Sequence, residues 1–159
     1  MEEVYPDLFI GDQDDCFYEQ KEDWAVIHAC KEPCYDMQLQ YQGDLPEDHP
    51  EYLMYIRNNH LYLNYPNPIT PFVEEKIFNE ASYFIHESLQ SFKVLVHSRS
   101  AVSRAPALVL VYLAASDKIA NETYEKAAAA FTELYPAYDP SPGMEQYLSN
   151  NWNEIFRDE

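Results

Sequence analysis

The residues best suited to carry chemistry lie in one short segment, 97–104, which reads His-Ser-Arg-Ser-Ala-Val-Ser-Arg. An apolar run, Val94–Val96, precedes the segment, and a long apolar run from Ala105 to Ser116 follows it. This pattern predicts a strand, a tight loop and a buried helix. Backbone N–H groups in such a loop, next to a helix N-terminus, attract anions, and the Arg104 guanidinium offers a fork of donors for phosphate oxygens. We therefore expect an oxyanion-binding loop.

The loop resembles the phosphate-binding motif of the cysteine-dependent protein tyrosine and dual-specificity phosphatases: His-Cys, two residues, Gly, two residues, Arg. His97 and Arg104 fit this pattern, and Pro106, with the apolar helix behind it, fits the bacterial dual-specificity branch. Ser98 stands at the position of the nucleophilic cysteine, and Ala101 at that of the glycine. The resemblance implies that His97 supports the loop and that the phosphate-binding residues are Ser98, Arg99, Ser100, Ala101, Val102, Ser103 and Arg104.

The resemblance also implies three catalytic positions, which are Ser98, Arg104 and a general acid upstream. In the family a loop before the nucleophile supplies an aspartic acid that protonates the leaving oxygen. By that alignment the acid position falls on Asn67, within Asn64-Tyr65-Pro66-Asn67-Pro68. Because asparagine has no ionisable proton to donate, the general acid is lost as well as the nucleophile.

The departure at Ser98 changes the expected chemistry. A cysteine here would ionise readily beside a helix end and an arginine and would attack phosphorus as a thiolate. A serine hydroxyl does not ionise in that field, and the sequence assigns no histidine and carboxylate to activate it. We therefore predict a pseudophosphatase, which binds a phosphorylated protein or other phosphate-bearing ligand but hydrolyses phosphoesters very poorly or not at all.

Two other interpretations stay open at this point. The chain could be an active phosphatase of this family, working through a cysteinyl-phosphate, whose nucleophile was replaced by Ser98. It could also be an acidic interaction protein that uses the fold as a scaffold and leaves the loop unoccupied. The Cβ of Ala101 favours the latter, since it disfavours a positive φ and crowds an incoming phosphate.

Composition limits the partners. The chain has 159 residues, 47% of them hydrophobic, which is enough for one domain over residues 1–159. Lys and Arg total 10 against 28 Asp and Glu, so the net charge of −18 argues against nucleic-acid binding. Three of the ten cations, Lys93, Arg99 and Arg104, lie around the loop and predict a locally positive field. No apolar run reaches the roughly 20 residues that span a bilayer, so we expect no membrane association.

The cysteines and the first residues bear on compartment and cofactors. Met1-Glu2-Glu3 lacks the basic and apolar regions of a signal peptide, and three cysteines do not suggest a disulfide framework, so we expect a cytoplasmic protein. Cys30-x-x-x-Cys34 with His28 could be regarded as a metal cluster. The spacing is loose and no fourth ligand is evident, so we expect neither a metal nor another cofactor.

Periodicity and turn residues predict a single α/β domain in which a short mixed sheet is flanked mostly by helices, and the resemblance implies that it is of the dual-specificity phosphatase type. The anion site should lie at the C-terminal end of the strand Val94–Val96. The expected strands are Val4–Asp12, Trp24–His28, Tyr52–Arg57, His60–Asn64 and Val94–Val96, with a turn at Asn58-Asn59. The expected helices are Pro71–Ser91, Ala105–Ser116, Glu122–Leu134 with Asn121 as its N-cap, and Pro142–Phe156.

Overall fold

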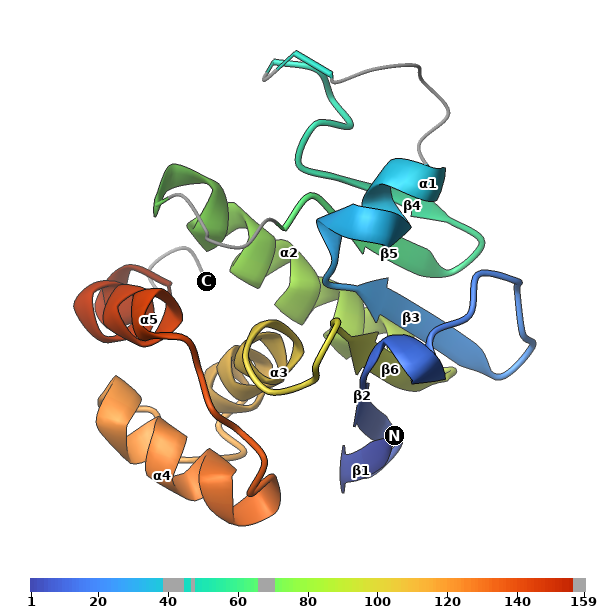
Figure 1. Ribbon diagram of the computed structural model, residues 1–159. Helices are drawn as coiled ribbons and strands as arrows, with labels where there is room; N and C mark the ends of the chain where they lie inside the picture. Colours follow the sequence, from blue (N-terminus) through green and yellow to red (C-terminus); the bar gives the residue numbers. More distant parts are fainter. Residues whose placement is uncertain (39–44, 47, 66–70, 156–159) are drawn as a thin grey trace.

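The computed structural model describes residues 1–38, 45–46, 48–65 and 71–155 (Figure 1). The strands are β1 (Glu2–Tyr5), β2 (Leu8–Gly11), β3 (Trp24–His28), β4 (Met54–Arg57), β5 (His60–Leu63) and β6 (Lys93–His97). The long helices are α2 (Pro71–Ser88), α3 (Arg104–Ala115), α4 (Tyr124–Leu134) and α5 (Pro142–Ile155). Three short helical segments, η1 (Gln13–Asp15), η2 (Lys31–Tyr35) and α1 (Asp36–Gln38), lie between strands.

The six strands form one mixed sheet in the order β1-β2-β6-β3-β5-β4. The inner strands β2, β6, β3 and β5 run parallel, while β1 and β4 pair antiparallel at the two edges. The predicted fold class, an α/β domain with a mixed sheet flanked by helices, is thus confirmed. The predicted single strand Val4–Asp12 is instead part of a hairpin, because Asp7 takes a φ of 65° and reverses the chain between β1 and β2.

The turn between β4 and β5 lies where the sequence predicted it. Asn58 and Asn59 have φ values of 53° and 66°. Two consecutive left-handed residues match the twist of a tight hairpin, and asparagine tolerates this conformation better than most residues. The turn brings β5, one of the inner strands, into register beside β3, where Tyr62 lies opposite His28.

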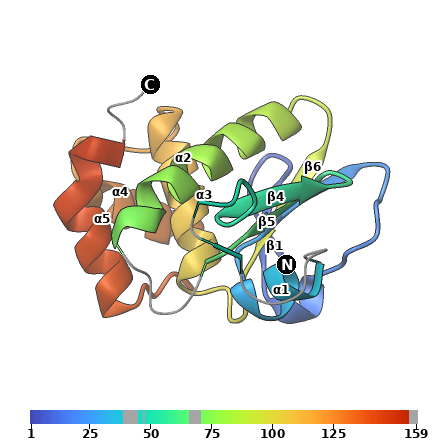
Figure 2. The same ribbon diagram turned by 90° about the horizontal axis from the view of Figure 1, so that it is seen from above.

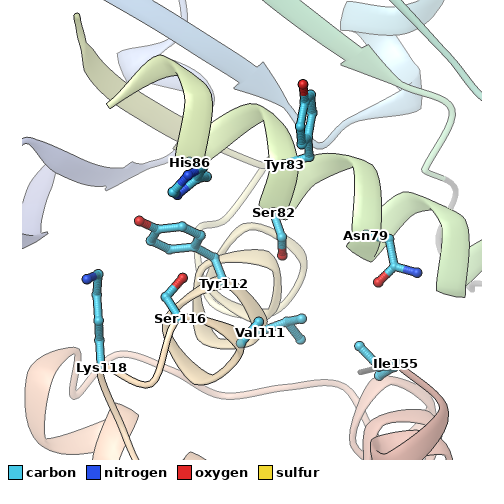
Figure 3. Close-up of a pocket in the computed structure, with 10 residues that line it drawn as sticks. Asn79, Ser82, Tyr83, His86, Val111, Tyr112, Ser116, Lys118 and Ile155 are labelled. Carbon is cyan, nitrogen blue, oxygen red and sulfur yellow. The ribbon is translucent and has the colours of Figure 1, made fainter. Parts of the chain in front are cut away.

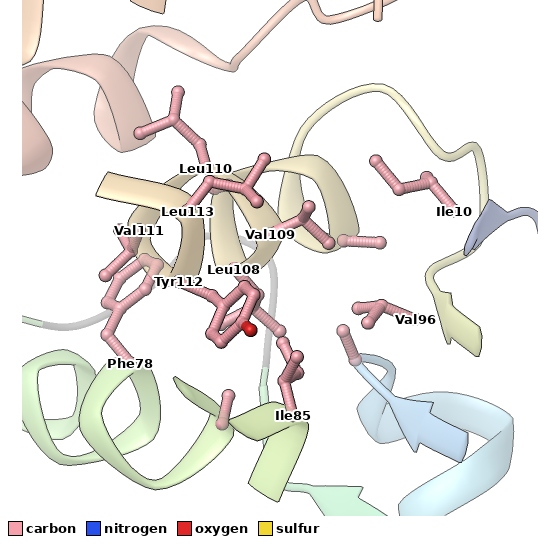
Figure 4. Packing of buried hydrophobic residues seen from close by; sticks show 14 of the residues in the cluster. Ile10, Phe78, Ile85, Val96, Leu108, Val109, Leu110, Val111, Tyr112 and Leu113 are labelled. Atoms are coloured by element: carbon pink, nitrogen blue, oxygen red, sulfur yellow. The ribbon is translucent and has the colours of Figure 1, made fainter. Parts of the chain in front are cut away.

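Helix α3 is the centre of the main hydrophobic core. All ten residues from Ala105 to Ala114 are buried, and the helix packs on β2 and β6 and against α2 and α4 (Figures 2 and 4). Side chains that point to this face of the sheet, such as Ile10 and Val96, alternate with side chains that point to the other face. A helix buried on every side must be apolar on every side, which explains why its sequence shows no polar stripe.

The C-terminal helices complete this layer, with one difference from the sequence prediction. Helix α4 begins at Tyr124, and its N-cap is Thr123, whose hydroxyl accepts a hydrogen bond from the Lys126 N–H at 3.1 Å. The prediction of Asn121 as the N-cap was wrong. Its amide instead donates to the Ala114 carbonyl at 3.0 Å, where it closes the end of α3.

The opposite face of the sheet has a different character. In Figure 1 helices α2–α5 gather on one side of the sheet, while α1 lies on the other side near β4 and β5. There a smaller cluster contains two cysteines and three tyrosines, Cys30, Cys34, Tyr35, Tyr55 and Tyr62. The buried imidazoles of His28, His60 and His97 lie on the same face. Among the residues described, no helix is long and apolar enough to cross a membrane.

Candidate functional site

The loop 97–104 connects the C-terminal end of β6 to the first residue of α3, as the sequence predicted. Ser98 is buried at 2% exposure, whereas Arg99 and Ser100 are exposed. Ala101 is buried and takes a φ of 58°, the left-handed conformation that favours glycine. Its Cβ therefore carries the strain that the sequence comparison anticipated, about 1–2 kcal/mol for an L-residue.

One side of the loop is held by the segment that follows β2. The Ser98 N–H donates to the Gly11 carbonyl at 3.3 Å, and the Gln13 N–H donates to the Arg99 carbonyl at 3.4 Å. Gly11 has no room for a side chain, because an added Cβ would lie 2.8 Å from an Asp15 carboxylate oxygen and 3.0 Å from Leu95. The close approach of β2 and η1 to the loop thus depends on glycine at this position.

The other side of the loop is held by the connection between α4 and α5. The Tyr135 hydroxyl donates to the Ala101 carbonyl at 2.7 Å, and the Asp139 N–H donates to the Val102 carbonyl at 2.8 Å. The hydroxyl of Ser103 accepts from the Ser141 N–H at 3.0 Å. Three consecutive loop residues are therefore fixed by one segment, which lies between the predicted helices Glu122–Leu134 and Pro142–Phe156.

Apart from the Ser98 N–H and the Ser103 hydroxyl, these contacts use carbonyls of the loop. In the described part of the chain, the backbone N–H groups of residues 99–103 have no protein acceptor. Such N–H groups, followed by the N-terminus of a 12-residue helix, are the donors of an anion site.

Ser98 and Arg104 occupy different roles in this geometry. The Ser98 Oγ accepts a hydrogen bond from the Ala105 N–H at 3.3 Å, in the first turn of α3. Arg104, at the start of α3, donates through Nη1 to the Tyr65 carbonyl at 2.9 Å. That bond uses one of the five N–H donors of the guanidinium, and the described residues offer the other four no acceptor. Asn67, the predicted acid position, lies outside the described residues.

The predicted cluster of cations is smaller than expected. Lys93 is the first residue of β6, and its ammonium lies 5.8 Å from the ring centroid of Trp24. Four residues of strand separate it from His97, a distance of about 13 Å. Lys93 therefore does not reach the loop, which leaves Arg99 and Arg104 as the two cations from that group.

His97 does not contact Ser98 through its side chain, because alternation along β6 directs the imidazole to the face opposite α3. There its Nε2 lies 2.6 Å from His28 Nδ1 and 3.8 Å from Cys34 Sγ. Burial lowers the pKa of His28 well below its usual value, and the neighbouring His97 and His60 add to this effect. A hydrogen bond with Cys34 lowers the pKa of Cys16, whose Sγ also lies 3.5 Å from His28 Nδ1.

The four side chains of Cys16, His28, Cys34 and His97 bring one potential ligand atom each within 4.8 Å of one another. The sequence analysis had considered Cys30 with Cys34 and His28, and it found no fourth ligand. In the fold Cys30 is not part of the group, and its Sγ donates to the Glu32 carbonyl at 2.6 Å. The missing ligands come from Cys16 and from His97, which are distant from Cys34 in sequence.

A separate pocket lies between the C-terminal parts of α2 and α3 (Figure 3). His86, Tyr112, Ser116 and Lys118 line it. Ser116 follows Arg104 by 12 residues of helix, which corresponds to about 18 Å. The pocket is therefore distinct from the loop 97–104 and takes no part in anion binding there.

Comparisons with known proteins bear on the fold. A scan against protein-family models finds no match, and a search of the curated proteins finds none either. Among solved structures, DUSP15 is similar at 21% identity and a TM-score of 0.62, covering 99% of this chain and 92% of that one. A human tyrosine phosphatase-like serine/threonine/tyrosine-interacting protein is similar at 21% identity and a TM-score of 0.64, covering 97% and 95%. Human DUSP28 is similar at 14% identity and a TM-score of 0.61, covering 96% and 93%.

At these identities the likeness establishes the architecture and leaves the chemistry to the residues of the site. The solved structures match over nearly the whole chain, so the similarity concerns the complete domain and not a fragment of it. The chain therefore has the fold of the dual-specificity phosphatases.

Proposed function

We propose that this protein binds a phosphate-bearing ligand, in particular a phosphorylated protein, through the loop 97–104, and that it does not hydrolyse phosphoesters. The observation that carries the proposal is the position of Ser98. Ser98 is 2% exposed, and its hydroxyl accepts from the Ala105 N–H at 3.3 Å, so it stabilises the first turn of α3. A serine nucleophile also needs a base, and the nearest histidine in sequence, His97, is engaged on the other face of the sheet.

Anion binding is supported by the parts of the loop that remain in place. The loop is bonded on both sides by neighbouring segments, which reduces the entropy that a ligand would have to remove. Free N–H groups, the helix end and the Arg104 guanidinium supply complementary charge. The excess of acidic residues elsewhere, with a net charge of −18, then restricts anion binding to this loop.

The binding part is tested with inorganic phosphate, by calorimetric titration and by the phosphate dependence of the melting temperature. Arg104→Ala is expected to weaken phosphate binding about 10-fold to 150-fold, since hydrogen bonds to charged groups contribute about 1.5–3 kcal/mol. Arg104→Lys keeps the charge but loses the forked set of donors, so its phosphate affinity is expected to lie between that of the unsubstituted protein and that of Arg104→Ala. Arg57→Ala, which removes a cation paired with Glu51 at 3.2 Å, is the control and should bind normally. Equal affinity in Arg104→Ala and Arg57→Ala would contradict the proposal.

The catalytic part is tested with a generic aryl phosphate and two proteins, the chain with Ser98 and its Ser98→Cys variant. We expect no hydrolysis by either, because a restored thiol still lacks the acid that Asn67 cannot supply. Clear turnover by a folded Ser98→Cys protein would show instead that the site is that of an active phosphatase with a replaced nucleophile.

A further inference from the structure

We propose that Cys16, His28, Cys34 and His97 form a zinc site on the face of the sheet opposite α3. The site shares His97 with the first position of the loop 97–104, but its test does not depend on phosphate binding. His28, Cys34 and His97 are each 0% exposed, and Cys16 is partly buried. Two thiolates and two neutral imidazoles are a common ligand set for structural zinc, and they neutralise the charge of the ion.

Three of the distances between the ligand atoms are close to those of a tetrahedral zinc centre. Bonds of about 2.3 Å to sulfur and 2.0–2.1 Å to nitrogen place two sulfurs about 3.8 Å apart and sulfur about 3.5 Å from nitrogen. Here the Sγ atoms of Cys16 and Cys34 are 4.0 Å apart. Cys16 Sγ lies 3.5 Å from His28 Nδ1, and Cys34 Sγ lies 3.8 Å from His97 Nε2.

The distance between the two imidazole nitrogens would have to increase when zinc binds. The two imidazole nitrogens, His28 Nδ1 and His97 Nε2, are 2.6 Å apart, whereas a tetrahedral centre holds them about 3.3 Å apart. An opening of about 0.7 Å is within the reach of small ring rotations. The Nδ1 of His97 is buried and has no hydrogen-bond partner among the described residues. This ring therefore keeps one unsatisfied polar atom whichever of its nitrogens carries the proton.

Hydrogen bonds outside the cluster fix the orientation of the His28 lone pair. The Glu19 carbonyl can only accept, so His60 donates to it through Nε2 at 3.0 Å. As a neutral ring, His60 then accepts at Nδ1 from His28 Nε2, at 2.8 Å. The proton of His28 is thus on Nε2, and its Nδ1 directs a lone pair at Cys16 and His97. Metal-binding histidines in proteins are typically oriented by such a second hydrogen bond.

Segments distant in sequence meet at this point, which gives the ion a structural role. Cys16 follows η1, His28 ends β3, Cys34 lies in η2, and His97 ends β6 immediately before the anion-binding loop. With four protein ligands the ion has no open position for a water or substrate, so it would tie these segments together and do no chemistry of its own. Binding converts two thiols to thiolates, and the two protons pass to solvent.

The decisive experiment uses the full chain, kept in a non-chelating phosphine reductant, stripped of metal and then given Zn²⁺ or Co²⁺. We expect one tightly held equivalent of zinc by elemental analysis after gel filtration, and a rise in melting temperature on adding it. The Co²⁺ form should show the visible bands of a tetrahedral ion and the ultraviolet charge-transfer bands of two thiolates. Because it needs no substitution, this measurement stands whether or not variants fold.

Matched cysteine variants locate the site. Cys16→Ser and Cys34→Ser are expected to lose the retained zinc, whereas Cys30→Ser should keep it, since the Cys30 thiol donates to the Glu32 carbonyl and Cys30 is not one of the four residues whose ligand atoms meet. The proposal is overturned if the natural chain retains well under one equivalent, or if Cys30→Ser loses zinc as Cys34→Ser does. A Cys16–Cys34 disulfide that persists in reductant would also overturn it.

Discussion

Tyr135→Phe tests whether the loop 97–104 is held by the segment after α4. The substitution removes one hydroxyl and leaves the ring, which is 6% exposed, in its place. That hydroxyl donates to the Ala101 carbonyl at 2.7 Å, and Ala101 is itself buried at 8% exposure. The variant therefore loses a hydrogen bond and also leaves a buried carbonyl without that donor.

The expected cost follows from these two effects. A buried group left without its partner costs about 1–3 kcal/mol, so we expect the free energy of unfolding to fall by about 2 kcal/mol. For a domain of this size that corresponds to a melting temperature lower by about 4–8 °C. Phosphate affinity should fall as well, because a loop that is less fixed loses more entropy on binding.

The control is Tyr112→Phe. Tyr112 is 4% exposed in the same core, but its hydroxyl has no hydrogen-bond partner in the part of the chain that the structure describes. We expect this variant to melt close to the natural protein. Differential scanning calorimetry of the three proteins measures the effect, and the reasoning is refuted if Tyr135→Phe and Tyr112→Phe melt alike.

The pH dependence of the same pair gives a second readout. Burial raises the pKa of Tyr135 above its ordinary value of 10.0. A group whose pKa is raised by folding contributes its stability below the unfolded pKa and loses it at higher pH. The difference in stability between the natural protein and Tyr135→Phe should therefore stay constant from about pH 7 to 9 and shrink above about pH 10.

Four further substitutions, at three positions, follow from the fold. Ala101→Gly should change stability by less than about 1 kcal/mol, because the relief of backbone strain at φ 58° is offset by the lost methyl contact and by the conformational entropy of glycine. Ala101→Val should cost more than about 2 kcal/mol, because a β-branched residue is strained further at this φ. Thermal melts of the two variants compare these effects. Thr123→Ala removes the cap of α4 and should cost about 1 kcal/mol in urea unfolding, and an unchanged midpoint would contradict the cap assignment. Phe131→Ala leaves a cavity at a residue that is 0% exposed and should lower the free energy of unfolding by about 3–5 kcal/mol. Denaturant unfolding measures this loss, and a loss below about 1 kcal/mol would contradict the prediction.

The sequence predicted the elements that local patterns determine. The run Val94–Val96 followed by small polar residues and an apolar helix was sufficient to place the loop between β6 and α3, because strand, turn and helix signals are local. The positive φ at Ala101 could also be anticipated, since the compared motif has glycine there. The N-cap of α4 was missed by two residues, because Asn121 and Thr123 are both good caps and tertiary contacts decide between them.

The Cys and His group could not be predicted in the same way. His28 and His97 are 69 residues apart and meet only because β3 and β6 are parallel neighbours in matching register. Strand order and register are tertiary properties that spacing in one sequence does not encode. One available signal was that His28 ends the predicted strand Trp24–His28 and His97 directly follows the predicted strand Val94–Val96, because parallel strands end at the same edge of a sheet.

The pairing of His28 with His97 across β3 and β6 also bears on how the chain finds a single alignment of its strands. A slip of one residue between neighbouring strands moves every side chain to the other face. His28 would then enter the aliphatic layer under α3 and lose its imidazole partners, at a cost of about 2 kcal/mol or more. Structures in which these strands are misaligned are thus higher in free energy than the native one, whether or not an ion binds. The buried imidazoles contribute to the uniqueness of the fold, a property that aliphatic residues at these positions would specify less sharply.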